Sequence, residues 1–511
     1  MQRSNFLITG YNLNVENSIE TVLTNRKISL SKSSLKKIKA SRNLVEKWIA
    51  NGEAIYGITT GFGEFKDVKI SQENLEKLQR NLILSHSAGV GKYVPDFIVR
   101  LMLLFRINSL TSGYSGVRIE LIEHLIKIFN SGIIPLIPSQ GSVGSSGDLA
   151  PLAHLALTVI GEGYCKLDGE IVESKFALSE KNISPIKLFA KEGLALINGT
   201  QMMTAYLCKA IYDAEYLSRL ADIAGSLSLD ALRGTSKAFS ENLQMVRPHK
   251  GQIASAYNLR RLLESSEIMI SHKNCGKIQD AYSLRCMPQV HGAVKDTIEH
   301  CKKVLEIELN SVTDNPLIFS ETDEHIAGGN FHGEPLALIA DFLAIAVSEL
   351  GNISERRVAR LLDGSLSGLP RFLADAGGLN SGLMIAQYTA ASIVSENKVL
   401  SHPASVDSIP TSANQEDHNS MGSIGAIKSF QVINNVKKVL AIEFLCAVQG
   451  IDFLRPLKSG KGCEAAYLYI RKRSKHVSED TIVSDLILKL SEIVFNEDFL
   501  RAVELKTGKL E

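Results

Sequence analysis

Apolar residues recur every three or four positions through long stretches of the second half of this chain. The stretches cover residues 200–226, 292–309, 333–362 and 423–449. Such spacing puts the apolar side chains on one face of a helix, and a face of that length has to be covered by other helices. The loops between the stretches are rich in Asn, Ser and Pro, which end helices. We therefore expect a bundle of long helices.

The first part of the chain carries shorter helical patterns and more loop. The patterns lie at residues 31–51, 73–86, 96–110 and 117–130. The predicted fold class is therefore mainly α. The change from shorter patterns to long ones falls near Asn198. We place a loop-rich N-terminal domain at residues 1–197 and the long helical bundle at residues 198–511.

One segment of the N-terminal domain has the pattern of strands. Between Tyr164 and Val172, two short alternating runs flank the pair Asp168-Gly169. An Asp-Gly pair suits the two-residue turn of a β-hairpin, because both positions adopt positive φ angles there. The sequence predicts a small β-hairpin here, within a domain that is otherwise helical.

Composition excludes several classes of partner. Lys and Arg number 56 against 55 Asp and Glu, so the charge balance gives no field for nucleic acid or for an anionic membrane. The seven cysteines are scattered, without a Cys-x-x-Cys pair or a zinc-like spacing with histidine. The N-terminus lacks the apolar run of a leader, and no apolar stretch reaches the length of a membrane span. We expect a soluble cytoplasmic protein that binds a small molecule and no metal.

The segment from Gly141 to Pro151 combines three glycines with small polar residues, just before an apolar helix. Such a loop bends tightly. By itself it is typical of a helix entry or of a cradle for an anion at a helix start. A nucleotide phosphate site is poorly supported, because the loop lacks the lysine of a P-loop.

The order Ser-Gly-Asp at residues 146–148, after a small residue, resembles the self-processing loop of the histidine, phenylalanine and tyrosine ammonia-lyases. Further motifs of this family recur in the same order from about Tyr56 to Pro456. They are Y-G-I-T-T-G-F-G at 56–63, L-S-H-S-A-G at 84–89, E-G-L-A-L-I-N-G-T-Q at 192–201, Q-D-A-Y-S-L-R-C at 279–286, D-N-P-L at 314–317, G-G-N-F-H-G-E-P at 328–335 and T-S-A-N-Q-E-D-H at 411–418. The series covers most of the chain, and together the motifs identify it as a member of this family.

The resemblance implies a cofactor made from the chain itself, 4-methylidene-imidazol-5-one (MIO), with no external cofactor. The nitrogen of Gly147 attacks the carbonyl carbon of Ser145, which requires a residue without a Cβ and a compressed loop. Loss of water closes the ring, and Ser146 loses its hydroxyl to become an exocyclic methylene. The methylene is an electrophile and serves as the electron sink of the reaction. The family usually has alanine in place of Ser145, and we expect serine to be tolerated because only its carbonyl enters the ring.

The same resemblance assigns roles to residues in distant motifs. Removal of ammonia from an α-amino acid needs a base for a weakly acidic β-proton as well as an electron sink. In the family pattern, Tyr56 and Tyr282 are the phenolic acid-base candidates and Arg285 pairs with the substrate carboxylate. Asn198 and Gln279 hold the ring and the substrate by hydrogen bonds, and Phe331 packs beside the ring. Without the motifs, each of these residues would be read as ordinary core, cap or ion-pair structure.

Two further motifs bear on the substrate. Ser85-His86 matches the histidine lyases, and Glu416 stands where the phenylalanine and tyrosine lyases carry a neutral glutamine. A carboxylate in a closed pocket pairs with an imidazole N–H but is left unpaired over a phenyl ring, at a cost on the order of a few kcal/mol. We therefore expect L-histidine as substrate, with His86 and Gln415 as further contacts. The products are then trans-urocanate and ammonia, the first step of histidine degradation.

Two alternatives stay open. The same chemistry serves a tyrosine ammonia-lyase or an aminomutase that returns the amine to the β-carbon. A helical scaffold protein that has lost the activity is an alternative of another class. The resemblance also implies a homotetramer whose active sites are shared between chains. His154 and His418 are interpreted as structural, and Met287 and His291 receive no role.

Overall fold

The computed structural model describes residues 4–61, 63–273, 276 and 278–511. Its contacts divide the chain into two compact units. The first unit comprises Met1–Tyr212, Cys301–Asp341 and Pro403–Ile427, and the second comprises Asp213–His300, Phe342–His402 and Lys428–Glu511. Each unit is assembled from separate parts of the sequence. The predicted boundary between the domains 1–197 and 198–511 stays a prediction.

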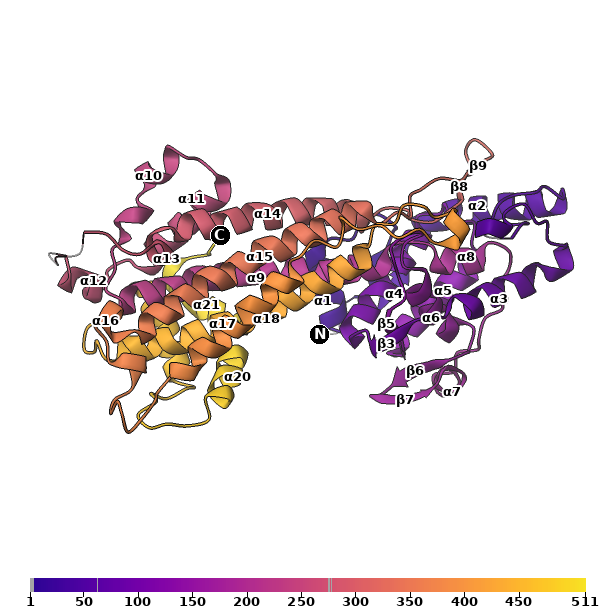
Figure 1. The fold of residues 1–511 in the computed structure, drawn as a ribbon. Helices are drawn as coiled ribbons and strands as arrows, with labels where there is room; N and C mark the ends of the chain where they lie inside the picture. The colour runs from indigo at the N-terminus through magenta and orange to yellow at the C-terminus, as the bar shows by residue number, and fades with distance from the viewer. Residues whose placement is uncertain (1–3, 62, 274–275, 277) are drawn as a thin grey trace. The chain divides into compact units, whose positions relative to one another are not determined.

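The predicted long helices are confirmed. They are α9 (Gln201–Ala231), α14 (Met287–Glu308), α15 (Glu334–Leu362) and α18 (Gly422–Asp452) (Figure 1). Helix α14 begins five residues before its periodic pattern. Its second residue is Pro288, and proline is accepted in a first turn because the amide there has no intrahelical partner. The mainly α fold class is therefore confirmed.

The shorter helices of the first unit also match their patterns. Helix α2 (Lys32–Ala50) begins after Ser31, whose side chain accepts the N–H of Ser33. Helix α5 (Ile119–Ser131) ends at Gly132, which has a left-handed φ of 81°. The remaining helices of this unit are α1 (Val15–Leu23), α3 (Leu75–His86), α4 (Asp96–Thr111), α6 (Leu149–Val159), α7 (Ser174–Glu180) and α8 (Glu192–Ile197). Helices α3, α6 and α8 pack against one another and hold the segments that lead into the site.

The strands are short. The predicted hairpin is confirmed as β6 (Tyr164–Leu167) and β7 (Glu170–Glu173), with φ of 50° at Asp168 and 94° at Gly169. The other pairs are β1 (Phe6–Ile8) with β2 (Ile28–Leu30), β3 (Val90–Tyr93) with β5 (Pro138–Gln140), β4 (Ile134–Pro135) with β6, and β8 (Leu317–Phe319) with β9 (Glu324–Ile326).

The second unit is helical outside the long helices as well. It contains α10 (Glu241–Met245), α11 (Lys250–Leu262), α12 (Glu267–Ser271), α13 (Tyr282–Arg285), α16 (Gly364–Ser367), α17 (Met384–Leu400), α19 (Lys461–Arg471), α20 (Val483–Val494) and α21 (Glu497–Thr507). Single turns of 3₁₀ helix occur in the chain at Gly63–Phe65, Gln72–Asn74, Ser236–Phe239, Arg371–Leu373 and Ser412–Asn414. Helix α13 carries two residues that the family pattern places in the site.

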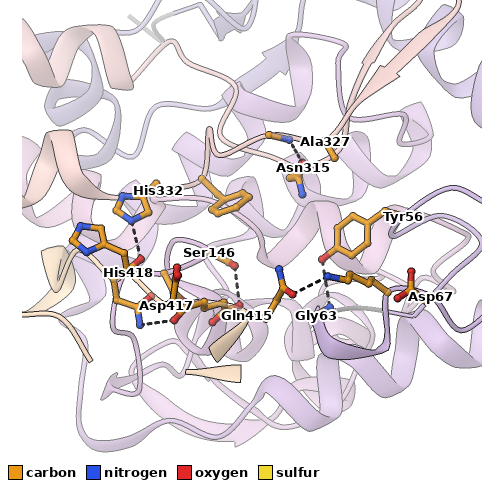
Figure 2. A pocket seen from close by; sticks show the side chains of 16 residues that line it. Tyr56, Gly63, Asp67, Ser146, Asn315, Ala327, His332, Gln415, Asp417 and His418 are labelled. Atoms are coloured by element: carbon orange, nitrogen blue, oxygen red, sulfur yellow. Dashed lines mark hydrogen bonds between the residues drawn. The ribbon is translucent and has the colours of Figure 1, made fainter. Parts of the chain in front are cut away.

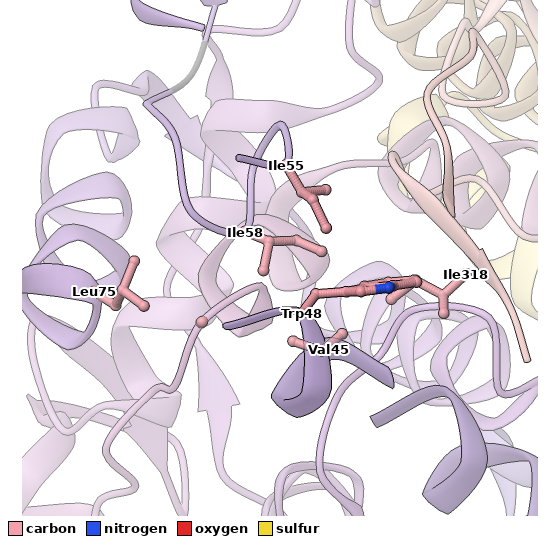
Figure 3. Close-up of a cluster of buried hydrophobic side chains, with 7 residues drawn as sticks. Val45, Trp48, Ile55, Ile58, Leu75 and Ile318 are labelled. Atoms are coloured by element: carbon pink, nitrogen blue, oxygen red, sulfur yellow. The ribbon is translucent and has the colours of Figure 1, made fainter. Parts of the chain in front are cut away.

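A cluster of buried apolar side chains fixes the segment around Tyr56 (Figure 3). Ile55 and Ile58, on either side of Tyr56, are 2% and 0% exposed and pack with Val45 and Trp48 of α2. Each buried aliphatic side chain contributes roughly 1.5–3 kcal/mol. The cluster therefore holds the backbone of this glycine-rich segment while the phenol of Tyr56 points elsewhere.

Helix α15 has an unusually apolar composition. Among the described residues it is the one helix long and apolar enough to cross a membrane, which differs from the expectation that no stretch reaches that length. Of its most apolar 18-residue window, 67% is buried inside the protein, which is the property of a core helix.

Candidate active site

A cavity of about 570 Å³ in the first unit brings together residues from distant motifs (Figure 2). Of the residues predicted for the site, it is lined by Tyr56, Ser145, Ser146, Phe331, Gln415 and Glu416. Its wall is completed by Gly63, Lys66, Asp67, Asn315, Ala327, Gly328, His332, Asp417, His418 and Asn419. Figure 2 shows Tyr56 on one side of the cavity, His332 and His418 on the other, and Ser146 between them.

The loop Ser145-Ser146-Gly147 is held tightly against Gly199. Gly147 has a φ of +76°, and a Cβ on it would lie 2.1 Å from the carbonyl oxygen of Gly199. The N–H of Gly199 donates to the carbonyl of Ser146 at 3.3 Å, and the N–H of Asp148 donates to the carbonyl of Gly199 at 2.7 Å. Only glycine fits at residue 147, for reasons of both conformation and space.

The side chain of Asp148 anchors this loop by hydrogen bonds. Its carboxylate is fully buried and accepts the N–H groups of Met202 and Met203, at the start of α9, at 2.9 and 3.0 Å. Its other oxygen accepts the hydroxyls of Ser142 and Ser423 at 3.1 and 2.8 Å. Burial raises the pKa of Asp148, and these four donors act in the opposite direction. Sequence reasoning gave Asp148 no role, although its place directly after Ser146-Gly147 was the available signal.

Glu416 faces the loop across the cavity. The hydroxyl of Ser146 donates to its Oε1 at 3.2 Å, and the hydroxyl of Thr411 donates to its Oε2 at 2.8 Å. Backbone hydrogen bonds between Thr411 and Glu416 run in both directions, at 2.9 and 3.3 Å. The carboxylate is therefore oriented, and it is half-buried rather than free in solvent.

Tyr56 presents its phenol to the same cavity. The N–H of Gly63 donates to the phenolic oxygen at 3.5 Å. Burial raises the pKa of Tyr56, the charge of Glu416 raises it further, and the Gly63 hydrogen bond partly offsets both. The group is a neutral phenol at neutral pH, and the charge of Glu416 acts on its ionisation.

Two predicted contacts lie near the cavity without lining it. His86 is the last residue of α3. Burial lowers its pKa, and the hydrogen bond to the backbone of Leu82 and the charge of Glu416 partly offset the effect, so its ring is neutral at neutral pH. Asn198 is 3% exposed, and its Oδ1 has no hydrogen-bond partner among the residues that the structure describes. Its backbone carbonyl accepts Nη2 of the buried Arg106 at 2.9 Å. Asn198 therefore keeps an unused acceptor one residue before Gly199.

The side chain of Gln415 is held by a lysine that the sequence had not indicated. It is exposed, and its Oε1 accepts the ammonium of Lys66 at 2.8 Å. Lys66 lines the cavity as well and was not singled out from the sequence. A lone lysine after Gly63–Phe65 offers no local pattern that predicts a partner more than three hundred residues away.

Three predicted residues belong to the second unit. Tyr282 is 72% exposed and lines a different cavity, of about 640 Å³, together with Arg356, Arg360 and Arg371. The guanidinium of Arg285 lies over the Tyr282 ring at 4.7 Å. Gln279 is exposed in the segment before α13. Of these three residues, only Tyr282 lines the second cavity, and Gln279 and Arg285 line neither of the two.

Three further histidines that the sequence analysis named have different surroundings. Nε2 of His154 accepts the N–H of Gly89 at 3.1 Å, a structural role as predicted. His291 is fully buried and bonded to Asp222 at 2.8 Å. His418 lines the Ser146 cavity, and its ring stacks on His332 at 5.7 Å. Within the described part of the chain, no group of three or more His, Cys, Asp or Glu side chains is placed to hold a metal ion.

The influence of Glu416 on Tyr56 gives a first testable prediction. Glu416→Gln lowers the pKa of Tyr56, because it removes a negative charge that disfavours the phenolate. Phenolate absorbance is followed against pH for each protein, and the curve of its Tyr56→Phe counterpart is subtracted. Asp417→Asn is the matched control, since Asp417 lines the cavity but is not among the groups that shift Tyr56. A pKa that stays unchanged or rises in Glu416→Gln contradicts the prediction.

Comparison with known proteins places this site in a family. A family model described as aromatic amino acid lyase matches residues 13–472. The chain is 53% identical to the histidine ammonia-lyase of Caldanaerobacter subterraneus subsp. tengcongensis, over 93% of each chain. It is similar to a crystal structure of histidine ammonia-lyase from Trypanosoma cruzi, at 43% identity and a TM-score of 0.92 over 99% of this chain and 96% of that one. A tyrosine aminomutase from Streptomyces globisporus matches at 38% identity and a TM-score of 0.93, over 99% and 100%. The chain belongs to the aromatic amino acid lyase family.

Proposed function

We propose that this chain is a histidine ammonia-lyase, a carbon–nitrogen lyase that converts L-histidine to trans-urocanate and ammonia without oxidation. The observation that carries the proposal is the carboxylate of Glu416 in the Ser146 cavity. Identity of 53% to one histidine ammonia-lyase and 49% to another, from Deinococcus radiodurans, supports it. Overall fold does not decide the substrate, because the tyrosine aminomutase superposes as well as the histidine lyase.

The segment Ser145-Ser146-Gly147 fits the MIO group that the family uses. The backbone of Gly147 is in the left-handed region and leaves no space for a side chain, so the segment has the tight bend that ring closure needs. The side chain of Ser146 lines the cavity, where a substrate can reach it. When formed, the group supplies an electrophilic methylene that takes up electrons from the substrate. Asn198 stands directly before Gly199, and its side-chain N–H groups are the donors that suit the carbonyl of the ring.

The polar groups of the cavity suit an imidazole ring. Glu416 accepts a ring N–H of the substrate in a charge-assisted hydrogen bond. His86 is neutral and half-buried, so it offers either a donor or an acceptor to the other ring nitrogen. Gln415 is held by Lys66 at the same wall. A phenyl ring would leave the carboxylate without a donor, which disfavours phenylalanine.

Proton transfer falls to the tyrosines. Tyr56 lines the cavity with Ser146 and serves as the acid-base group for the β-proton, after loss of its own proton. Arg285 pairs with the substrate carboxylate and Tyr282 assists at the same site. These two residues come from another copy of the chain, in a homotetramer with shared sites. The high exposure of Tyr282 supports this arrangement.

Exposed apolar helix faces support the assembly. Helix α17 has 17 residues, of which Ala386, Ala390 and Asn397 are buried. Large apolar side chains of α15 and α17 are exposed, namely Leu338, Phe342, Ile345, Ile385, Tyr388 and Val399. Such faces are covered by partner helices in oligomers. The six cysteines that the structure describes are free thiols, which fits a cytoplasmic enzyme, and Cys275 lies outside the described residues.

Replacing Ser146 and Ser145 in turn tests which of the two side chains the MIO group requires. Ser146→Ala keeps the fold and loses nearly all activity, because no hydroxyl remains to be eliminated. Ser145→Ala is the matched control and stays close to the parent, since alanine supplies the same carbonyl. The intact mass of the parent and of the control lies two waters below the value for the unmodified chain. Ser146→Ala lacks this deficit, and full activity in that variant would refute the mechanism.

Glu416→Gln tests the substrate. The value of kcat/KM for histidine falls by roughly 100-fold or more, because a charge-assisted hydrogen bond is lost from a desolvated site. Activity on L-tyrosine and L-phenylalanine is measured in parallel, by absorbance of their unsaturated products. The loss is specific for histidine if Glu416 binds the imidazole. An unchanged kcat/KM for histidine removes Glu416 from the site.

The shared site is tested by complementation. Tyr56→Phe and Tyr282→Phe chains are each inactive, and mixing followed by reassembly restores part of the activity if one site takes Tyr56 and Tyr282 from different chains. Each variant reassembled with itself is the control. A monomer in light scattering with full specific activity contradicts the arrangement.

Two other functions are separated by the same assays. A tyrosine ammonia-lyase or an aminomutase acts on L-tyrosine rather than L-histidine, and an aminomutase gives a β-amino acid in place of the unsaturated acid. An inactive helical scaffold shows the full mass of the unmodified chain. Urocanate formation from L-histidine distinguishes the proposed function from all of these.

A further inference from the structure

His332 lies between the cavity and the start of helix α15. It is half-buried, and it follows Phe331 on the cavity wall. Figure 2 shows its ring beside that of His418, away from Tyr56. The two rings are parallel to within 3°. None of the roles assigned above uses His332.

Both ring nitrogens of His332 have a defined partner. Nδ1 accepts the N–H of Glu334 at 3.3 Å. Nε2 lies 3.1 Å from the carbonyl oxygen of His418. A carbonyl can only accept, so Nε2 carries the proton and Nδ1 is the free acceptor. The ring is therefore a neutral imidazole in one tautomer, and it uses its single donor and its single acceptor at once.

The first of these bonds stabilises a helix. Glu334 is the first residue of α15, and its N–H is one of the amides at a helix start that have no partner inside the helix. The side chain of His332 satisfies it. Because α15 is a long and largely buried helix, this bond fixes the position of the imidazole relative to the protein core.

The second bond acts on the loop that carries Glu416. Residues Ser412 to Gln415, Asp417 and His418 are exposed, so this loop has little apolar packing of its own. The bonds between Thr411 and Glu416 hold the loop to itself. Lys66 reaches it at Gln415, and Asn419 anchors it beyond His418, where Asn419 is buried. Within the loop, Nδ2 of Asn419 donates to the carbonyl of Glu416 at 3.5 Å. His332 supplies the nearest bond on the C-terminal side that comes from another segment, two residues from Glu416 along the chain.

We propose that His332 is a positioning residue for Glu416. It fastens the backbone at His418 to the start of α15, and so fixes where the Glu416 carboxylate stands relative to the substrate. The proposal rests on the proposed function, because Glu416 is taken there to bind the imidazole of the substrate. A carboxylate displaced by about 1 Å from its productive place can cost on the order of 100-fold in rate.

Two replacements separate the helix bond from the loop bond. In His332→Asn, the side-chain oxygen still accepts the amide two residues later, as asparagine does in Asx turns, but it cannot reach the carbonyl of His418. In His332→Gln, the longer amide places its nitrogen about where Nε2 stands and keeps a donor for that carbonyl. His332→Asn therefore keeps the hydrogen bond to the N–H of Glu334, which caps α15, and loses the hydrogen bond to the carbonyl of His418. The second is the matched control for the loop bond.

The expected result is a loss of activity without a loss of stability. His332→Asn unfolds at a temperature close to that of the parent and shows the same mass deficit, but its kcat/KM for histidine falls between about 10-fold and 100-fold. His332→Gln retains most of the activity. Amides of residues 411–419 exchange with deuterium faster in His332→Asn than in the parent. A His332→Asn chain with the parent kcat/KM overturns the proposal, and so does one that fails to fold, because the cap it keeps would then not suffice.

A double-mutant cycle shows whether His332 acts through Glu416. In a Glu416→Gln background, His332→Asn costs at most about twofold more if it acts by placing that carboxylate. A further loss as large as in the parent means that His332 acts in another way, and this outcome overturns the proposal. The proposed function fails separately: a parent protein that does not form urocanate refutes it, whereas an active parent with an equally active His332→Asn refutes only the role of His332.

Discussion

The buried carboxylate of Asp148 is the interaction on which the site depends. A fully buried charge is tolerated only when its oxygens are satisfied, and Asp148 accepts two backbone amides from the start of α9 and two serine hydroxyls. These bonds join the loop of Ser146 to two long helices, since Ser423 lies in the first turn of α18. The position of Gly147 against Gly199 follows from this attachment.

The same attachment extends to the opposite wall of the cavity. Ser420 donates its hydroxyl to the carbonyl of Gly144 at 2.9 Å, and the N–H of Met421 donates to the carbonyl of Val143 at 2.9 Å. The chain that leads away from Glu416 is thereby bonded to the chain that leads into Ser145. Ser146 and the carboxylate of Glu416 are therefore placed by one continuous set of hydrogen bonds, and the exposed stretch between Thr411 and Asn419 is the part that needs additional anchors.

Sequence reasoning succeeded where the signal is local. Periodicity predicted the long helices, and Asp168-Gly169 predicted the hairpin. Family motifs named the residues that share the Ser146 cavity, but they also named Tyr282, which lines another one. Lys66 and His332 received no role from the sequence, although His332 lies in the motif at 328–335, because the partner that matters for each is far along the chain. Hydrogen bonds between residues so far apart leave no periodic or local pattern in the sequence, so only the folded structure reveals them.

On the proposed function, the hydrogen bond between Ser146 and Glu416 connects formation of the MIO group with the choice of substrate. In the unmodified chain, both oxygens of Glu416 have a donor, Ser146 for Oε1 and Thr411 for Oε2. In the proposed MIO group, a second loss of water, from Ser146, removes this hydroxyl and would leave Oε1 without its donor. An unsatisfied acceptor of this kind costs about 1–3 kcal/mol, and more when it is charged. An imidazole N–H restores the missing bond, whereas a phenyl ring does not. On the proposed function, the elimination that makes the group reactive also creates the vacancy that favours histidine. The overall fold need not differ for this, since the tyrosine aminomutase matches with a TM-score of 0.93.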